Sequence, residues 1–364
     1  MTGAWPGEPV VDEPYPGPPP MLRPQQVQHP APPFPWWQPA VPWTPPPPAL
    51  PPGAPPHDVP RPYLQVMRTR DWAWWRPFLG LLLITVIYLV AATLVVLLAL
   101  VTDVAPNLDL LDLVDPAVLL VTNLSLIIAI PVVWLAWAVA HGLRPGWSSS
   151  VLARLRWRLL PPFTLIALAT LGLGIGLSVL LSFLVGGEKV TGPVPAFGWL
   201  MLVVLLTTPL QSAAEEYLFR GYLSQAIAGW IRAPQVGAVV AAVLSALLFA
   251  AAHGSQDALT FLDRFAFGLA ASAVVWLTGG LEAAIVLHAV NNVLVFVLAG
   301  ALGEGVATEA VPSGFGLGFA ALSLASMAAY VVVVAQSRRR LHPETRTSAV
   351  DLRTPAPLRP VAAR

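Results

Sequence analysis

Long apolar runs separated by short polar stretches make up most of this chain. Eight runs are long enough to cross a bilayer, whose hydrocarbon core takes about 20 helical residues. Their approximate bounds are 78–102, 116–140, 161–185, 197–228, 235–253, 262–279, 281–300 and 315–336. Polar residues interrupt the fifth and sixth runs most. The pattern predicts an all-α fold, a polytopic membrane bundle of about eight transmembrane helices.

The charges between the runs test this count. Basic residues gather in alternate segments: Arg68, Arg70, Arg76, Arg144, Arg154, Arg156, Arg158, Arg232, Arg338, Arg339 and Arg340. The other loops carry mostly acids, namely Asp103, Asp109, Asp112, Asp115, Glu188, Asp257, Asp263, Glu304 and Glu309. Cytoplasmic loops are enriched in Lys and Arg. An even number of spans with both termini in the cytoplasm fits this asymmetry, and seven spans would not.

The two ends of the chain differ from its middle. Residues 1–62 hold 24 of the 40 prolines, so this stretch cannot form a helix or bury a core. We expect a disordered Pro-rich tail over 1–66, a transmembrane bundle over 67–340 and a disordered tail over 341–364, both tails cytoplasmic. Trp36, Trp37 and Trp43 could serve a partner of the first tail.

Composition narrows the class of protein. The chain is 56% hydrophobic and only 11% charged, whereas soluble domains carry about 25% charged residues. There is no cysteine, which excludes disulfides and thiolate metal sites. Lys189 is the single lysine among 20 basic residues, a bias typical of GC-rich bacterial genomes. We therefore expect an integral protein of a bacterial cytoplasmic membrane.

Two adjacent carboxylates lie near the end of the fourth run. An ionisable group at the centre of a bilayer costs about 2.5–3.5 kcal/mol, so Glu215 and Glu216 indicate a polar cavity. Neighbouring helical residues point about 100° apart, and the two side chains therefore cannot share one task. Glu216 and Arg220 are four residues apart and predict an ion pair. Glu215 has no such partner in the pattern, so we expect its side chain to face the cavity.

Two more polar patterns follow in later runs. Phe249 and His253 are one helical turn apart, and so are His288 and Asn292. Taken singly, His253 could be an interfacial histidine and the His288–Asn292 pair could join two helices. Together with Glu215 they predict one polar site built from three spans. Counting along the runs puts His253 nearer the opposite face, so the fifth helix must start deeper, tilt or break.

Other features are assigned no chemistry. Glu282, Asp263 and Arg264 lie near span ends, where they can reach water. The pairs Gly172 and Gly176, and Gly314 and Gly318, suit close helix–helix approach.

The three patterns resemble a known family, the CAAX protease and bacteriocin-processing (CPBP, or Abi) intramembrane proteases, which include the eukaryotic CAAX prenyl endopeptidase. Its motifs EExxxR, FxxxH and HxxxN appear in order as Glu215-Glu216…Arg220, Phe249…His253 and His288…Asn292. The resemblance covers about residues 197–300, and the eight-span layout agrees with it. Motifs of other intramembrane protease classes, such as HExxH or GxGD, are missing from the sequence.

The resemblance implies an endopeptidase of the membrane. Glu215, helped by His253, would take a proton from the attacking water, and His288 and Asn292 would donate hydrogen bonds to the oxyanion. Glu216, Arg220 and Phe249 would support them. A metalloprotease is the alternative, with Glu215, His253 and His288 as the three ligands of a zinc ion.

The expected partners are membrane lipids and a peptide or membrane-anchored protein substrate, with no nucleic acid. Two other functions stay open at this point. One is a non-catalytic immunity or regulatory membrane partner, and the other is a proton-coupled transporter. No inverted repeat of the motifs supports the transporter.

Overall fold

In the computed structural model, the described residues are 59–69, 71–104, 112–186, 192–303, 316–349 and 352. Eight helical segments among them are long and apolar enough to cross a membrane, and the described part contains no strand. The predicted all-α bundle of eight spans is thus confirmed. The spans are Arg76–Val101, Pro116–His141, Trp157–Leu184, Phe197–Trp230, Pro234–Ala251, Ala258–Thr278, Glu282–Leu302 and Gly316–Leu341.

Some spans are divided into several elements. The second consists of α2 (Pro116–Ile127) and α3 (Ala129–His141). The third contains α4 (Leu160–Leu181), and the fourth is formed by α5 (Phe197–Glu216), a π-helix (Tyr217–Leu223) and α6 (Ser224–Trp230). The remaining helices are α1 (Arg76–Val101), α7 (Pro234–Ala251), α8 (Ala258–Thr278), α9 (Glu282–Leu302) and α10 (Gly316–Leu341).

Local sequence sets where several helices begin and end. Proline occupies the first turn of α1, α2, α4 and α7, where its missing N–H costs no hydrogen bond. Asp115 caps α2 and Asp257 caps α8 through their carboxylates. Gly142, Gly279 and Gly303 end α3, α8 and α9 in the left-handed conformation.

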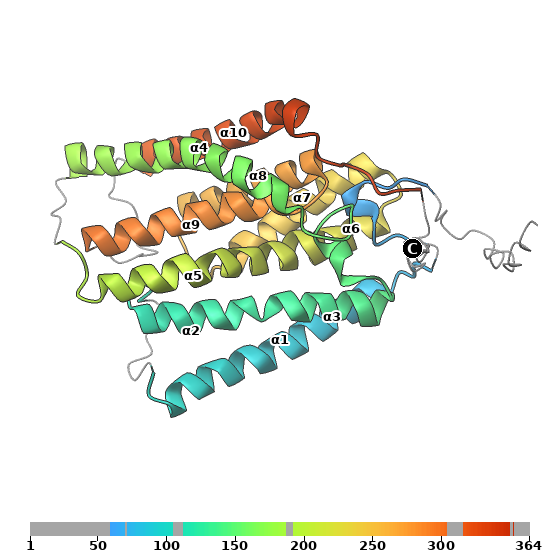
Figure 1. Cartoon of the computed structure of the whole chain (residues 1–364), viewed down its shortest axis with the longest axis horizontal. Coiled ribbons are helices and arrows are strands. Elements are labelled where there is room, and N and C mark those ends of the chain that lie inside the picture. Colours follow the sequence, from blue (N-terminus) through green and yellow to red (C-terminus); the bar gives the residue numbers. More distant parts are fainter. Residues whose placement is uncertain are drawn as a thin grey trace, which may run out of the picture. The chain divides into compact units, whose positions relative to one another are not determined.

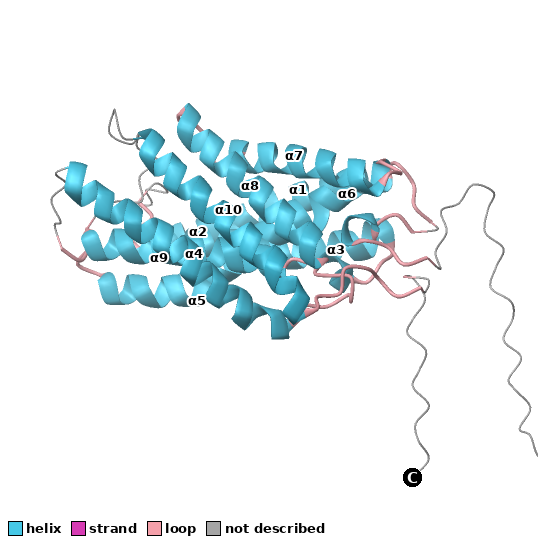
Figure 2. Ribbon diagram, turned by 90° about the horizontal axis from the view of Figure 1, so that it is seen from above, coloured by secondary structure: helices cyan, strands magenta, loops and turns pink. Residues whose placement is uncertain are grey.

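The helices α5 and α9 lie side by side (Figure 1), with α5 at one edge of the bundle in the view of Figure 2. On one side α5 packs against α2, and α1 packs against α2 and α3. On the other side α9 packs against α4 and α8, while α10 packs against α4 and α8. The first half of α9, which carries His288, is therefore buried among other helices, whereas α5 keeps an exposed apolar face that includes Trp199, Leu205 and Leu206.

The fourth span is unusually long. Its 34 residues extend about 50 Å, whereas the hydrocarbon core is about 30 Å thick. The π-helix Tyr217–Leu223 follows directly after the two glutamates. A π-helix inserts extra backbone into an α-helix and is frequent at functional sites. The length of this span sets where α7 begins, because α6 and α7 pack against each other as a hairpin.

The segment 59–69 differs from the prediction of a tail up to residue 66. Val66 and Met67 are fully buried, and the Tyr63 hydroxyl donates to the Ser148 carbonyl. The Gln65 amide donates to the Ala228 carbonyl at 3.0 Å. Apolar side chains and backbone partners hold this segment against the bundle, although prolines flank it. The remainder of the predicted tail, 1–58, lies outside the described residues.

The beginning of the predicted C-terminal tail is also packed. Arg61 N–H donates to the Thr347 hydroxyl at 3.0 Å, and Thr347 N–H donates to the Arg61 carbonyl at 2.9 Å. The two ordered chain ends therefore meet at one end of the bundle, which we call the termini end. This arrangement follows from an even number of spans.

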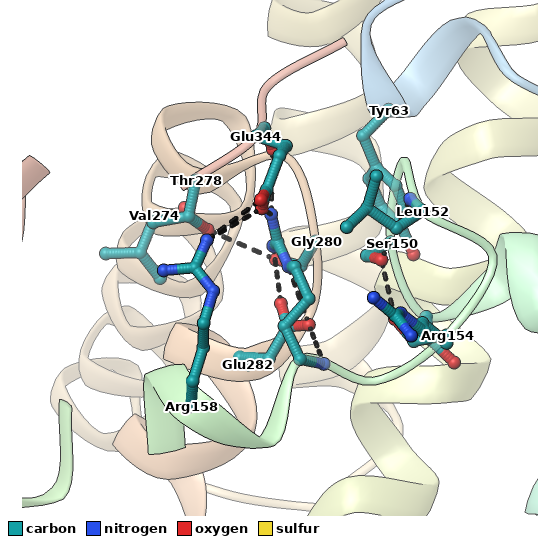
Figure 3. A network of polar contacts seen from close by, with 12 residues as sticks. Tyr63, Ser150, Leu152, Arg154, Arg158, Val274, Thr278, Gly280, Glu282 and Glu344 are labelled. Carbon is teal, nitrogen blue, oxygen red and sulfur yellow. Dashed lines mark hydrogen bonds and ion pairs between the residues drawn. The ribbon is translucent and has the colours of Figure 1, made fainter. Parts of the chain in front are cut away.

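Glu282 lies in a buried ion pair at the termini end, which corrects the expectation that it reaches water. Arg156 donates from Nε to Glu282 Oε1 at 2.9 Å and from Nη2 to Oε2 at 2.6 Å. Arg156 Nη1 also donates to the Glu344 carbonyl at 2.7 Å. Figure 3 shows Glu282 at the centre of this network, with Arg158 reaching the Glu344 carboxylate. The network joins α9, the loop before α4 and the C-terminal segment.

The close helix–helix contact of α4 is at Gly174 and not at the predicted Gly172 and Gly176. A Cβ added to Gly174 would lie 2.5 Å from Ser326 Cβ of α10. A Cβ at Gly176 would meet nothing within 4 Å, and one at Gly172 would be 3.9 Å from Leu294. Gly318 likewise has only ordinary contact distances, and Gly314 lies outside the described residues.

Candidate functional site

Glu216 is neutralised inside the bundle. Its Oε1 accepts from Arg220 Nη1 at 2.9 Å and from His288 Nδ1 at 2.9 Å. The side chains of Glu216 and Arg220 are fully buried. Arg220 Nη2 also donates to the Gly268 carbonyl of α8 at 3.0 Å. The ion pair predicted from the four-residue spacing is present, and it ties α5 to α8 and α9.

Glu215 has different surroundings. Gln211 Nε2 donates to its Oε1 at 2.5 Å, and its Oε2 lies 3.6 Å from His288 Nε2. The Glu215 side chain keeps 15% exposure, whereas that of Glu216 keeps none. The two carboxylates thus point to different partners, as expected for consecutive helical residues. Glu215 retains accessible surface that a small molecule could contact.

His288 lies between the two glutamates. Its Nδ1 contacts Glu216, its Nε2 faces Glu215, and its side chain is only 4% exposed. The Nδ1 contact fixes the orientation of the imidazole ring. Asn292, one turn further along α9, donates weakly to Gln211 Oε1 at 3.4 Å and to Ser212 Oγ at 3.5 Å. The α5 and α9 groups therefore form one connected polar cluster.

His253 reaches the same region, and the long fourth span resolves the mismatch in its depth. From Pro234 to His253 α7 and its last turn rise about 28 Å, and from Trp230 back to Glu215 the distance is about 22 Å. Because α6 extends the fourth span before the chain turns back into α7, the end of α7 returns to within about 6 Å of the level of Glu215. His253 lies within electrostatic range of Glu215 and His288, without a hydrogen bond between them among the described residues.

Phe249 packs at the centre of the cluster. Its ring centroid is 4.8 Å from that of His253 and 5.7 Å from that of His288. The Arg220 guanidinium carbon lies 4.9 Å from the same centroid. Phe267 adds a further edge contact with His288 at 5.1 Å. These aromatic rings restrict both imidazoles and cover the buried guanidinium.

Beyond His253, the turn 252–257 leads to the first residue of α8. His253 Nδ1 contacts the Phe249 carbonyl at 2.8 Å, and the ring is exposed. Asp257 accepts from the Thr260 hydroxyl and from the backbone of Thr260 and Leu259, and these bonds hold the pKa of Asp257 below its ordinary value. The carboxylate therefore stays charged as the cap of α8.

Two polar residues of this region, Gln211 and Asn123, lie outside the three motifs and were not predicted from the sequence. Gln211 lies four residues before Glu215, and that spacing was the available signal for their contact. Asn123 of α2 donates to the hydroxyls of Thr207 at 2.8 Å and Thr208 at 3.1 Å. Nothing in the sequence around Asn123 indicated this contact, because it depends on the packing of α2 against α5.

The zinc alternative requires three ligands around one point. Among the described residues, no group of three His, Cys, Asp or Glu side chains is placed to hold a metal ion. Glu215 Oε2 and His288 Nε2 are 3.6 Å apart, whereas among the described residues His253 makes no hydrogen bond or ion pair with either of them. The donor set does not fit the usual three-ligand zinc geometry.

These observations define an integral membrane protein with a buried polar site assembled from α5, α7 and α9. Residues 196–294 match the family model described as type II CAAX prenyl endopeptidase Rce1-like. The match contains all three motifs and confirms the resemblance on which the sequence analysis relied. It supports a CAAX-type intramembrane protease in general.

A curated relative is also similar over a larger part of the chain. It is YyaK of Bacillus subtilis (strain 168), an uncharacterized protein that is 28% identical over 232 residues. The alignment covers 60% of this chain and 75% of that protein. No solved structure matches the chain significantly.

Proposed function

We propose that this protein is an intramembrane endopeptidase in which Glu215 activates a water molecule for attack on a peptide carbonyl. The observation that carries the proposal is the division of work between two adjacent glutamates. Glu216 is held by Arg220 and His288, whereas Glu215 is held on one oxygen only and keeps exposed surface. A carboxylate kept inside a membrane without a neutralising arginine suits a proton acceptor.

In the reaction the water lies between Glu215 and His253. Glu215 takes one proton as the water oxygen bonds to the scissile carbonyl carbon, and the carbonyl oxygen becomes an oxyanion. The carbon–nitrogen bond then breaks, and the proton passes to the leaving amine. His253, at the open end of α7, orients the water. This order of steps consumes one water and yields a carboxylic acid and an amine.

Asn292 and His288 are the oxyanion donors in this proposal. Asn292 carries two N–H donors, and its contacts with Gln211 Oε1 at 3.4 Å and Ser212 Oγ at 3.5 Å are both long, so an oxyanion can replace the one to Ser212. His288 donates from Nδ1 to Glu216, so a second donation from Nε2 requires the imidazolium form. Removing one oxyanion donor typically lowers the rate about 10²–10³-fold. The Glu216–His288 contact then serves to orient a donor as well as to neutralise Arg220.

The substrates we propose are peptides or membrane-anchored proteins, with CAAX-type termini as the class that the family description names. The termini end of the bundle carries the basic loops, and we propose that it faces the cytoplasm. No step of the mechanism uses a metal, since the donors do not converge. Cleavage is therefore expected to persist after strict chelation, and its complete loss, restored by zinc alone, would contradict this mechanism.

The test compares purified wild type with Glu215→Gln. Both are incubated in detergent with a proteome-derived peptide library that is supplemented with farnesylated CAAX peptides, and new N-termini are identified by mass spectrometry. New termini formed by the wild type and missing with Glu215→Gln are the expected result. Identical sets of termini from both proteins would overturn the proposal and favour a non-catalytic membrane partner.

A further inference from the structure

Gln211 makes contacts on both sides of the candidate site. Its Nε2 donates to Glu215 Oε1 at 2.5 Å, and its Oε1 accepts from Asn292 Nδ2 at 3.4 Å. Ser212 Oγ also donates to the same Oε1 at 3.3 Å. The residue is only 6% exposed. A single amide therefore links the proposed base on α5 with a proposed oxyanion donor on α9.

We infer that Gln211 is a positioning residue, which fixes the Glu215 carboxylate and the Asn292 amide relative to each other. The inference rests on the proposed function and adds a residue to it. The two ends of the Gln211 amide cannot be exchanged, because an ionised carboxylate only accepts hydrogen bonds. With its nitrogen at Glu215, its oxygen necessarily faces Asn292 and Ser212.

This orientation has a consequence for each partner. Glu215 Oε1 accepts the hydrogen bond from Gln211, whereas Oε2 faces His288 and is the oxygen that would contact the attacking water. The Asn292 amide nitrogen contacts Gln211 Oε1 at 3.4 Å and Ser212 Oγ at 3.5 Å, and the N–H directed at Ser212 is the one that would turn to an oxyanion. Catalytic groups need to be held within about 0.5 Å of the productive geometry, and supporting hydrogen bonds provide this precision.

The competing explanation is that Gln211 only fills space between α5 and α9. Methionine has a similar length and no amide, so Gln211→Met removes the hydrogen bonds and keeps most of the volume. Gln225→Met is the matched control, because Gln225 is also buried and donates to the Trp147 and Gly221 carbonyls instead of to groups of the site. A second variant, Gln211→Glu, keeps the size and polarity of the side chain but has a carboxylate oxygen in place of the amide N–H donor.

The experiment measures kcat and KM on a peptide that the wild type cleaves in the library assay. We expect Gln211→Met and Gln211→Glu to lower kcat by about tenfold or more, because a small misplacement of reacting groups can cost up to about 10²-fold, with KM within about twofold. The thermal midpoint of Gln211→Met should match that of Gln225→Met. In the Asn292→Ala background, Gln211→Met should lower kcat clearly less than in the wild type.

Wild-type kcat in both Gln211 variants would overturn the inference, and so would a full, additive loss in the Asn292→Ala background. If Gln211→Met fails to fold, the same criteria apply to Gln211→Glu. A failure of the proposed function gives a different result from a failure of this inference. In the first case the wild type and Glu215→Gln already release the same termini, before any Gln211 variant is measured.

Discussion

At the scale of single residues, Glu215 and Glu216 show how one helix can hold two carboxylates for different purposes. Glu216 is fully buried and shares its oxygen with a guanidinium and an imidazole. Glu215 is partly exposed and is held by a neutral amide. The side chains are chemically identical, so the structural role of Glu216 and the catalytic role that we propose for Glu215 are distinguished only by their surroundings.

This contrast predicts opposite outcomes for two substitutions of the same kind. Glu216→Gln leaves Arg220 buried without its counter-charge, and breaking a buried pair in this way typically costs about 3–5 kcal/mol of unfolding free energy. Glu215→Gln should unfold close to the wild-type midpoint and lose cleavage by at least about 100-fold. Thermal unfolding in detergent and the library assay measure both. A stable Glu216→Gln protein would contradict the structural role of that residue.

At the scale of elements, the distance between helices depends on particular small residues. In α4 this residue is Gly174, whose position leaves no room for a Cβ beside Ser326. Gly176, two residues later, faces open space. The same helix therefore offers a tight position and a free position for comparison.

We expect Gly174→Ala to destabilise the bundle by about 1–3 kcal/mol, because the added methyl group forces α4 and α10 apart. Gly176→Ala should be neutral or should stabilise by up to about 1 kcal/mol through helix propensity. The midpoints of thermal unfolding in the same detergent compare the two. Equal destabilisation by both substitutions would show that the α4–α10 contact is not the cause.

The loop before α4 offers a second comparison. Arg156→Met leaves the fully buried Glu282 without its partner, which should cost about 3–5 kcal/mol. Arg158 is half exposed and pairs with the partly exposed Glu344, so Arg158→Met should cost less than about 1 kcal/mol. Unfolding midpoints again provide the measurement, and a larger effect of Arg158→Met would be inconsistent with this ranking.

Sequence patterns predicted contacts within one helix better than contacts between helices. The Glu216–Arg220 pair follows from four-residue spacing, which any helix imposes. The depth of His253 could not be counted, because it depends on the π-helix and on how far α6 extends the chain before it turns back into α7. The partners of Asn123 and Gly174 depend on neighbouring helices that no local pattern specifies. Glu282 looked solvated because its partner Arg156 is 126 residues away.

At the scale of the whole bundle, both ordered chain ends meet at the termini end. The backbone pairing of Pro62 with Arg346 and the bonds between Arg61 and Thr347 place them next to each other. The basic loops lie at this end too, as the charge pattern predicted. Because basic loops are usually retained in the cytoplasm, we propose that the termini end is the cytoplasmic end.

The absence of cysteine from the sequence makes the sidedness directly measurable. Single cysteines at Ser348 and Val104, both exposed and at opposite ends of the bundle, are labelled with a membrane-impermeant maleimide on spheroplasts. Val104→Cys should react on intact spheroplasts, and Ser348→Cys only after lysis. The reverse pattern would place the termini outside the cell.

The contact between Arg61 and Thr347 also makes the bundle suitable for circular permutation, in which the two present ends are joined and the chain is opened elsewhere. Proteins whose ends adjoin usually tolerate circular permutation. A short linker from residue 349 to residue 59, with the chain reopened between α9 and α10, would make α10 the first span and preserve every helix–helix contact. Both new ends would then emerge on the other side of the bilayer, where a purification tag or a surface-display module could be attached.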